Sequence, residues 1–125
     1  MKNGDNSIHS TVVQFAYDAL GRRIRKIDSI ASSTTVYYNN NNWQVLSEYD
    51  GSNNFQRSCV YGNYIDEVLM MTDSGSNDYY YAHDHLFSPA ALIDDNGTVV
   101  ERYEYDAYGD CNVLDADYSK DADVI

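Results

Sequence analysis

Apolar and polar residues alternate along most of this chain with a period of two, and no ten-residue window shows the three- and four-residue apolar spacing of a helix. Segment 98–106 is the clearest example, because its odd-numbered positions from Val99 to Tyr105 point to one side and its even-numbered positions to the other. The same pattern, less regular, covers three more segments: 34–38, 43–50 and 77–84. The pattern predicts an all-β protein.

Turn-forming residues recur between these segments at steps of 10 to 12 residues. The expected turns begin at Asp18, Asp28, Asn39, Asp50, Gly62, Asp73, Asp84, Asp94 and Asp106. A step of about 11 residues fits five to seven residues of strand followed by about four of turn. The chain is therefore predicted to be an internal repeat of antiparallel β-hairpins.

The expected turns contain residues that can form them. Asp and Asn accept hydrogen bonds from the backbone that follows them, and glycine adopts a positive φ without steric cost. Glycines stand in or beside five of these turns: Gly21, Gly51, Gly75, Gly97 and Gly109. Pro89 is the sole proline, and we expect it at a strand start, an edge or a bulge, because it has no N–H for the sheet.

The composition of the chain lies close to that of disordered proteins. Leu, Ile, Val and Phe account for 26 of 125 residues at a net charge of −12, close to the level at which high charge predicts disorder. Thirteen tyrosines favour folding, because each can bury a large ring while its hydroxyl stays in water. We therefore expect the tyrosines to stack between neighbouring strands near the turns.

Charge and composition also exclude several functions. A pI near 4.2 argues against nucleic-acid binding, which needs a basic face. No apolar run approaches the roughly 20 residues of a spanning helix, so we expect no membrane insertion, and the N-terminal residues show no signal peptide. Cys59 and Cys111 fit neither a zinc knuckle nor a disulfide-dense scaffold, and their redox state stays open.

Several ordered segments resemble the Rhs (rearrangement hotspot) or YD-repeat family. Segment 14–23 (QFAYDALGRR) resembles the YD-repeat signature, and segments 61–71, 79–109 and 111–119 resemble the RHS repeat-associated core in order and spacing. The motif residues are Tyr17, Asp18, Gly21, Arg22, Tyr49, Asp50, Tyr61, Gly62, Asp84, His85, Leu86, Gly97, Tyr103, Tyr105, Asp106 and Gly109. We expect them to form turns and stack across strands.

The resemblance implies a strip of β-hairpins that spirals into a hollow shell, incomplete in this chain. In bacterial relatives such shells wrap a toxic C-terminal domain, and other relatives serve in insecticidal toxin complexes and cell-surface adhesion. The expected partners are thus the rest of the shell and a C-terminal effector, in a secreted or cell-surface protein. The family's self-cleavage motif, DPxG, does not occur here, so no residues are assigned to autoproteolysis.

The resemblance also sets expected boundaries. The core segment covers residues 12–119, between a frayed or disordered N-terminus at 1–11 and a frayed tail at 120–125. Many relatives have glycine where this chain has Phe87, so we expect the turn near that residue to differ from the family's.

Candidate chemistry is weak. His83 and His85 could share a strand face and bind a metal, but no third ligand is near in sequence. A calcium loop would need a Gly where Lys120 stands, although the spacing of its first ligands is matched by Asp115, Asp117, Ser119 and Asp121.

The sequence also gives no strong candidate for acid–base or nucleophilic catalysis. The carboxylate pairs Asp94–Asp95 and Asp66–Glu67 point to opposite faces of a strand. Pairing either cysteine with His83 or His85 rests on counting alone, and no GxSxG context places a nucleophilic serine. We therefore assign no catalytic, cofactor or metal residue and expect no enzyme activity.

Two functional hypotheses follow. The first is a structural β-shell segment that encloses or presents a C-terminal effector. The alternative is a carbohydrate-binding or adhesive surface module, because exposed tyrosine rings beside Asn and Asp are a common way for β proteins to hold sugars.

Overall fold

The computed structural model describes residues 11–119 as ten β-strands joined by short turns, with no helix in that range. The strands are β1 (Val13–Tyr17), β2 (Arg23–Asp28), β3 (Ser33–Asn39), β4 (Val45–Asp50), β5 (Phe55–Tyr61), β6 (Val68–Asp73), β7 (Asp78–His83), β8 (Pro89–Asp94), β9 (Val99–Tyr105) and β10 (Cys111–Asp115). The termini expected to fray lie outside the described residues, apart from position 11.

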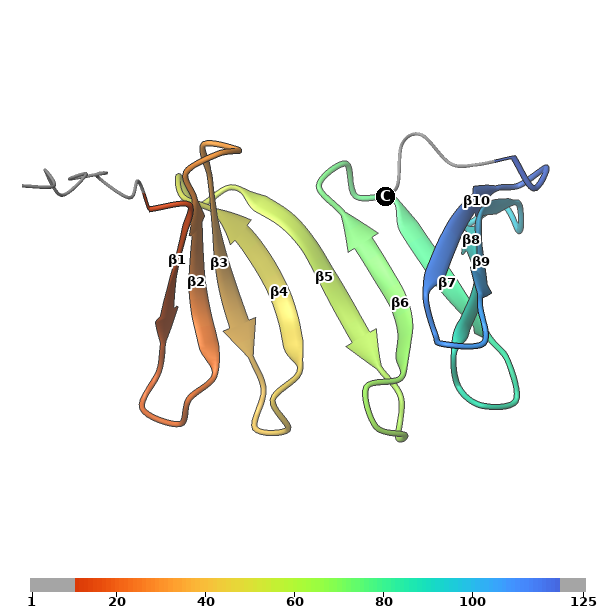
Figure 1. Cartoon of the computed structure of the whole chain (residues 1–125), viewed down its shortest axis with the longest axis horizontal. Helices are drawn as coiled ribbons and strands as arrows, with labels where there is room; N and C mark the ends of the chain where they lie inside the picture. The colour runs from red at the N-terminus through yellow and green to blue at the C-terminus, as the bar shows by residue number, and fades with distance from the viewer. Residues whose placement is uncertain (1–10, 120–125) are drawn as a thin grey trace, which may run out of the picture.

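All ten strands form one antiparallel sheet in sequence order, each paired with its neighbours in the chain (Figure 1). Among residues 11–119, strands β1 and β10 are at the two edges of the sheet and each pairs with one neighbouring strand. The structure thus confirms the predicted all-β strip of hairpins, open at both ends.

The turns between the strands form two rims along the strip. The turns after β1, β3, β5, β7 and β9 lie along the lower margin of Figure 1, and we call them the lower rim. The lower rim comprises turns 18–22, 40–44, 62–67, 84–88 and 106–110. The remaining turns form the upper rim, which lies along the opposite margin.

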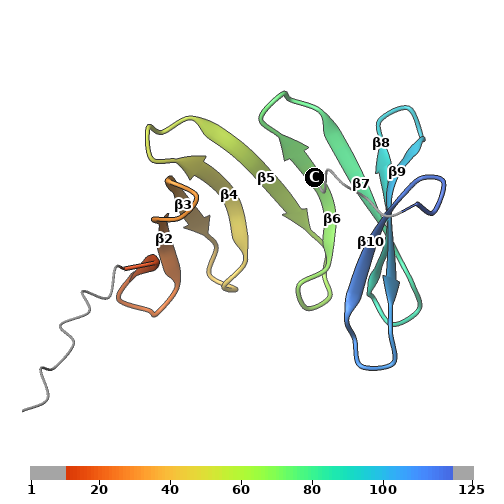
Figure 2. The same ribbon diagram turned by 45° about the horizontal axis from the view of Figure 1, so that its top comes forward.

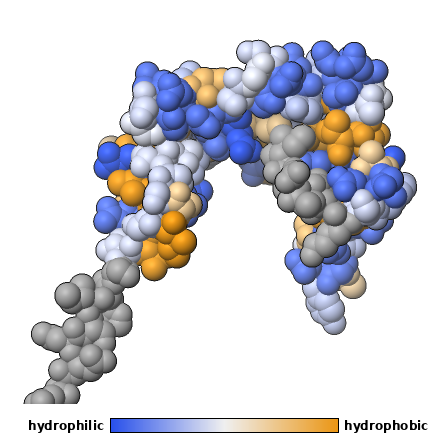
Figure 3. Space-filling model, turned by 90° about the horizontal axis from the view of Figure 1, so that it is seen from above, coloured by the Kyte–Doolittle hydropathy of each residue, from blue (hydrophilic) through white to orange (hydrophobic). Residues whose placement is uncertain are grey.

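The strip curls rather than lying flat, and the space-filling view from above is arched and hollowed (Figures 2 and 3). Six register shifts interrupt the strand pairs, one of them where His83 pairs with Pro89 at the start of β8. Bulges increase local twist and bend strands, which accounts for the curl. The expected place of Pro89, at a strand start and a bulge, is confirmed.

One face of the sheet carries most of its buried side chains. The strand register places Cys59 opposite Met71 and Leu92 opposite Glu101 on this face. Met71, Leu92 and Glu101 are almost inaccessible to solvent. Because side chains on the hollow side of a curled sheet crowd together, we call this the inner face.

Candidate functional site

Eight turns in residues 11–119 share one geometry, seven of them between paired strands and one after β10. The N–H of the first residue donates to the carbonyl of the fifth at 2.8–3.0 Å, and the N–H of the fourth donates to the carbonyl of the first at 3.0–3.3 Å. The fourth residue has a positive φ. This is a type I turn closed by a left-handed residue. The eight turns begin at Asp18, Asn40, Asp50, Asp73, Asp84, Asp94, Asp106 and Asp115.

Glycine takes the left-handed position in three of these turns, at Gly21, Gly97 and Gly109. In the other five turns φ is between 64° and 69° at a residue with a side chain: Trp43, Asn53, Ser76, Phe87 and Tyr118. The expectation that Gly51 and Gly75 supply the positive φ is therefore wrong, because Asn53 and Ser76 take that position. Gly62 also lacks a positive φ, and its turn is closed by a bond from Gly62 N–H to the Glu67 carbonyl at 2.8 Å.

The first residue of most of these turns accepts backbone hydrogen bonds with its side chain. In seven of the eight turns its Oδ1 accepts hydrogen bonds from the N–H groups of the third and fifth residues, as at Asp84, which binds Leu86 and Ser88 at 2.8 and 3.0 Å. The same bonds are made by Asp18, Asn40, Asp50, Asp73, Asp94 and Asp106. In the second lower-rim turn this residue is Asn40, whereas the sequence suggested Asn39, which ends β3.

These bonds favour the ionised carboxylates. The side-chain amides of Asn54 and Asn77 hold the pKa values of Asp50 and Asp73 below the usual range. Backbone bonds from Ser88 and Leu86 lower the pKa of Asp84 in the same way. The turns are therefore built for charged aspartates, which explains much of the chain's acidity.

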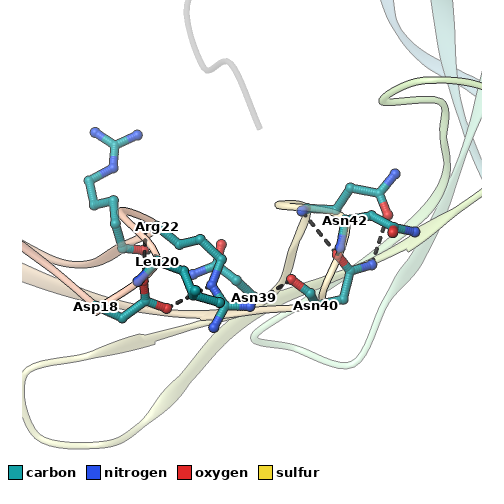
Figure 4. A network of polar contacts seen from close by, with 8 residues as sticks. Asp18, Leu20, Arg22, Asn39, Asn40 and Asn42 are labelled. Atoms are coloured by element: carbon teal, nitrogen blue, oxygen red, sulfur yellow. Dashed lines mark hydrogen bonds and ion pairs between the residues drawn. The ribbon is translucent and has the colours of Figure 1, made fainter.

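The YD signature joins two neighbouring turns of the lower rim (Figure 4). Arg22 donates from Nε to Asp18 Oδ2 at 2.6 Å and from Nη1 to the Asn40 carbonyl at 2.9 Å. Desolvation raises the pKa of Asp18, but the bonds from Arg22 more than offset it, so the pKa is lowered. Arg22 thus fixes its own turn and ties it to the next hairpin.

Turn 84–88 keeps the shared geometry although Phe87 replaces the family's glycine. Phe87 has φ 64°, and its N–H donates to the Asp84 carbonyl at 3.1 Å. Its ring stacks on Tyr64 from turn 62–67, with ring centres 4.0 Å apart. Phe87 thus takes the position that glycine takes in three other turns of this chain, and the aromatic stack offers a reason why a strained residue is tolerated there. A difference from the relatives' turn stays a prediction.

The predicted tyrosines have different surroundings. Tyr49 packs edge-on against Tyr38 and Phe55, and the Tyr61 hydroxyl donates to the Val45 carbonyl at 3.0 Å. Tyr17 and Tyr105 are 58% and 44% exposed. Cross-strand contacts of this kind contribute on the order of 0.2–1 kcal/mol each.

The inner face holds the most unusual polar contact. Glu101 is 1% exposed, and the Tyr103 hydroxyl donates to its Oε2 at 2.6 Å. Burial, with this hydrogen bond and the carboxylate charge, raises the pKa of Tyr103 well above its usual value. Tyr103 also stacks against Tyr81 at 6.5 Å. Tyr103 was expected to stack, but nothing in the sequence indicated that Glu101 would be buried.

A shallow cavity of about 600 Å³ opens at the N-terminal end of the strip. Its lining includes Arg22, Arg25, Tyr37, Tyr38 and Asn39. Apolar side chains, among them Ile24 and Val36, complete the lining. The cavity is open rather than enclosed, so the geometry defines a surface and no closed binding pocket.

The weaker chemical candidates do not converge. His83 ends β7 and His85 lies in the following exposed turn, so they do not share one strand face. Ser119 donates from its hydroxyl to Asp115 and from its N–H to Asp117, while Asp121 lies outside the described residues. Within residues 11–119 no three His, Cys, Asp or Glu side chains are grouped for a metal.

The carboxylate pairs and the cysteines are also separate. Asp94 caps its turn while Asp95 accepts a bond from Asn96, and Asp66 has a positive φ in turn 62–67, where Glu67 binds the Tyr64 N–H. Cys59 and Cys111 are free thiols. Burial raises the pKa of the Cys59 thiol, which disfavours the reactive thiolate.

An open, curled strip of antiparallel hairpins, closed by one repeated Asp-led turn, defines a structural β module. The Teneurin YD-shell family matches residues 5–120, so the chain belongs to that family and is a segment of its β-shell. It is 30% identical over 108 residues to the tRNA3(Ser)-specific nuclease WapA of Bacillus spizizenii and 26% identical over 100 residues to teneurin-3 of Danio rerio. These matches cover 86% and 78% of this chain but 4% of each relative's length.

Proposed function

We propose that this segment forms part of the wall of a larger β-shell that encloses or presents an effector located elsewhere in the same polypeptide. The single observation that carries the proposal is the open sheet, because within residues 11–119 β1 and β10 each have one edge without a partner strand, where further strands can pair. The match to the YD-shell family over residues 5–120 supports the same role.

The effector part of the proposal draws on the relatives. Two Bacillus relatives, at 30% and 31% identity, are nucleases by name, and this chain spans 4% of each. The nuclease activity would therefore be located outside the region matched here. We place the protein in a secreted or cell-surface setting, in keeping with YD-repeat relatives, and expect the segment itself to act without catalysis.

Limited proteolysis of the polypeptide that carries this segment tests the proposal. Gly109→Val should break the last lower-rim turn, because φ is 85° there and a β-branched residue is strained at positive φ. We expect the effector to resist protease in the parent protein and to be cut in the variant. Asn112→Gln, an exposed change on the same hairpin, is the control. A variant shell that is measurably destabilised but leaves the effector equally resistant would refute the enclosing role.

Carbohydrate binding is a second candidate, supported by the cavity that Tyr37, Tyr38 and Asn39 help to line. Tyr38 is 51% exposed and Trp43 is 62% exposed, so a sugar bound at this end of the strip should change the intrinsic fluorescence. A panel of glycans at millimolar concentration that leaves Trp and Tyr emission unchanged would remove this candidate. Tyr38→Ala should abolish any change that is seen.

A further inference from the structure

The two rims of the strip differ in the side chains at their tips. Every lower-rim turn exposes at least one large apolar or aromatic side chain, between 46% and 97% exposed: Leu20, Trp43, Tyr64, Ile65, Leu86, Phe87 and Tyr108. The three middle turns of the upper rim, at 51–54, 74–77 and 95–98, contain Gly, Ser, Asn, Asp and Thr alone. On the upper rim, large apolar side chains are found at the two ends, at Ile30 and Tyr118.

Contacts join two pairs of neighbouring lower-rim turns. Tyr64 stacks on Phe87 across two neighbouring turns. Trp43 reaches back to the first turn, where its ring lies 3.5 Å from the position a Cβ would take on Gly21. Consecutive lower-rim turns are two strands apart, or about 10 Å. An exposed apolar row of this extent marks an interaction surface, because single-domain proteins rarely leave one uncovered.

Charge differs between the two ends of this row. At the rim itself, residues 17–23 contain Arg22, Arg23 and Asp18, a net charge of +1. Residues 105–111 at the other end contain Asp106 and Asp110 and no basic residue, a net charge of −2. The row is therefore complementary in charge to a copy of itself that runs in the opposite direction.

We propose that the lower rim is an assembly surface whose partner is the lower rim of a second copy of this chain. The two copies are related by a two-fold axis through turn 62–67, so that turn 18–22 of each copy faces turn 106–110 of the other. The equal spacing of the turns then brings apolar tips together along the whole row. A parallel arrangement would place like charges together, and the polar upper rim offers no apolar match. This proposal goes beyond the wall role and does not depend on an effector.

Sedimentation velocity on the 125-residue chain tests the surface with a matched pair of variants. Ile65, on the lower rim, and Ile30, on the upper rim, are 80% and 77% exposed. We expect a dimer in the parent chain, at least tenfold weaker dimerisation in Ile65→Arg, and an unchanged dimer in Ile30→Arg. Circular dichroism should show the same fold in all three.

Three results would overturn the proposal. The first is a monomeric parent chain at tens of micromolar, and the second is equal loss of the dimer in both variants. The third is open-ended polymers, because these would show pairing of the β1 and β10 edges instead of a closed rim contact.

Cysteine cross-linking tests the two-fold arrangement and does not rely on weakening the dimer. In a chain with Cys59→Ser and Cys111→Ser, Ile65→Cys lies near the axis and should cross-link to its own copy under mild oxidation. The Leu20→Cys variant and the Tyr108→Cys variant should each form no cross-linked dimer on their own. A mixture of the two variants should form a cross-linked dimer. Self-cross-linking of Leu20→Cys would show a parallel arrangement and refute the two-fold axis.

Discussion

The N-terminal half of this strip, β1 to β5, and the C-terminal half, β6 to β10, are built from the same hairpin but are stabilised by different contacts. All four residues that are buried within the described range belong to β6, β8 and β9: Met71, Ala91, Leu92 and Glu101. Strands β1 to β4 contribute none of them. The C-terminal half is therefore stabilised by a small core on the inner face, whereas the N-terminal half depends on contacts near its surface.

Surface contacts in the N-terminal half are specific nonetheless. The Arg23 guanidinium lies 5.3 Å from the Phe15 ring centre and 5.2 Å from that of Tyr37, so it bridges β1 and β3. Arg22 joins the first two lower-rim turns. The comparison shows that repeated turns and cross-strand contacts suffice to form the sheet, while burial is added in β6, β8 and β9.

Leu92→Ala should have the largest effect of the changes considered, because this side chain is fully buried. Loss of a buried leucine leaves a cavity and typically costs about 2–5 kcal/mol. Urea unfolding should show this loss, whereas Leu46→Ala in β4, where the side chain is 42% exposed, should cost less than about 1 kcal/mol. Equal losses would show that the difference in burial between the two halves does not determine their stability.

Tyr103→Phe should come next, at about 1.5–3 kcal/mol, because it removes a hydrogen bond to the buried Glu101 carboxylate. The raised pKa of Tyr103 also predicts that the stability of the fold decreases at alkaline pH. A raised pKa in the folded chain means that its stabilising contribution is complete below pH 10 and lost as pH rises further.

Burial also raises the pKa of Tyr81 in β7, next to Tyr103, so alkaline unfolding should begin in the C-terminal half. Amide hydrogen exchange above pH 10, compared with exchange at pH 8, shows which half of the strip loses protection first. Tyr103→Phe should flatten the decline in stability above pH 10, and a decline as steep as in the parent chain would contradict the role of this hydroxyl.

The local features of this fold could be predicted from the sequence, and the long-range ones could not. Period-two alternation and the Asp-led turns are short-range signals, so the hairpins were predictable almost to the residue, with Asn39 in place of Asn40 as the error. The left-handed positions of Trp43 and Phe87 have no such signal, because aromatic residues rarely adopt positive φ. Burial of Glu101 depends on the curl produced by bulges in several strand pairs, which no local pattern encodes.

The sequence contains a signal for the apolar lower rim that the predictions did not include. Its signal appears when alternate turns are compared, since Leu20, Tyr64, Leu86 and Tyr108 share the third position of turns on one side of the strip. When all turns are treated as equivalent, the apolar residues of the lower rim are combined with the polar residues of the upper rim, and the difference between the rims is lost.

Arg23→Gln tests the surface contacts of the N-terminal half. It removes two cation–π contacts of an exposed side chain, each worth about 0.5–1 kcal/mol, so we expect a loss of about 1–2 kcal/mol. Arg25→Gln, an equal change of charge on the same strand, is the control and should cost less. If both variants lose the same stability, net charge rather than ring contact accounts for the effect.

A reciprocal exchange of turn residues tests whether the turns of the two halves are equivalent. Ser76 in the C-terminal half and Gly21 in the N-terminal half have φ 65° and 81° at the same position of the shared turn. Ser76→Gly should stabilise the chain by about 0.5–1 kcal/mol, and Gly21→Ala should destabilise it by about 1–2 kcal/mol, because an L side chain is strained in the left-handed region. A Cβ at Gly21 would meet Trp43 at an ordinary 3.5 Å, so a clash does not confuse the comparison. Thermal melts of both variants decide the matter, since a stabilised Gly21→Ala would show that the turns of the two halves are not interchangeable.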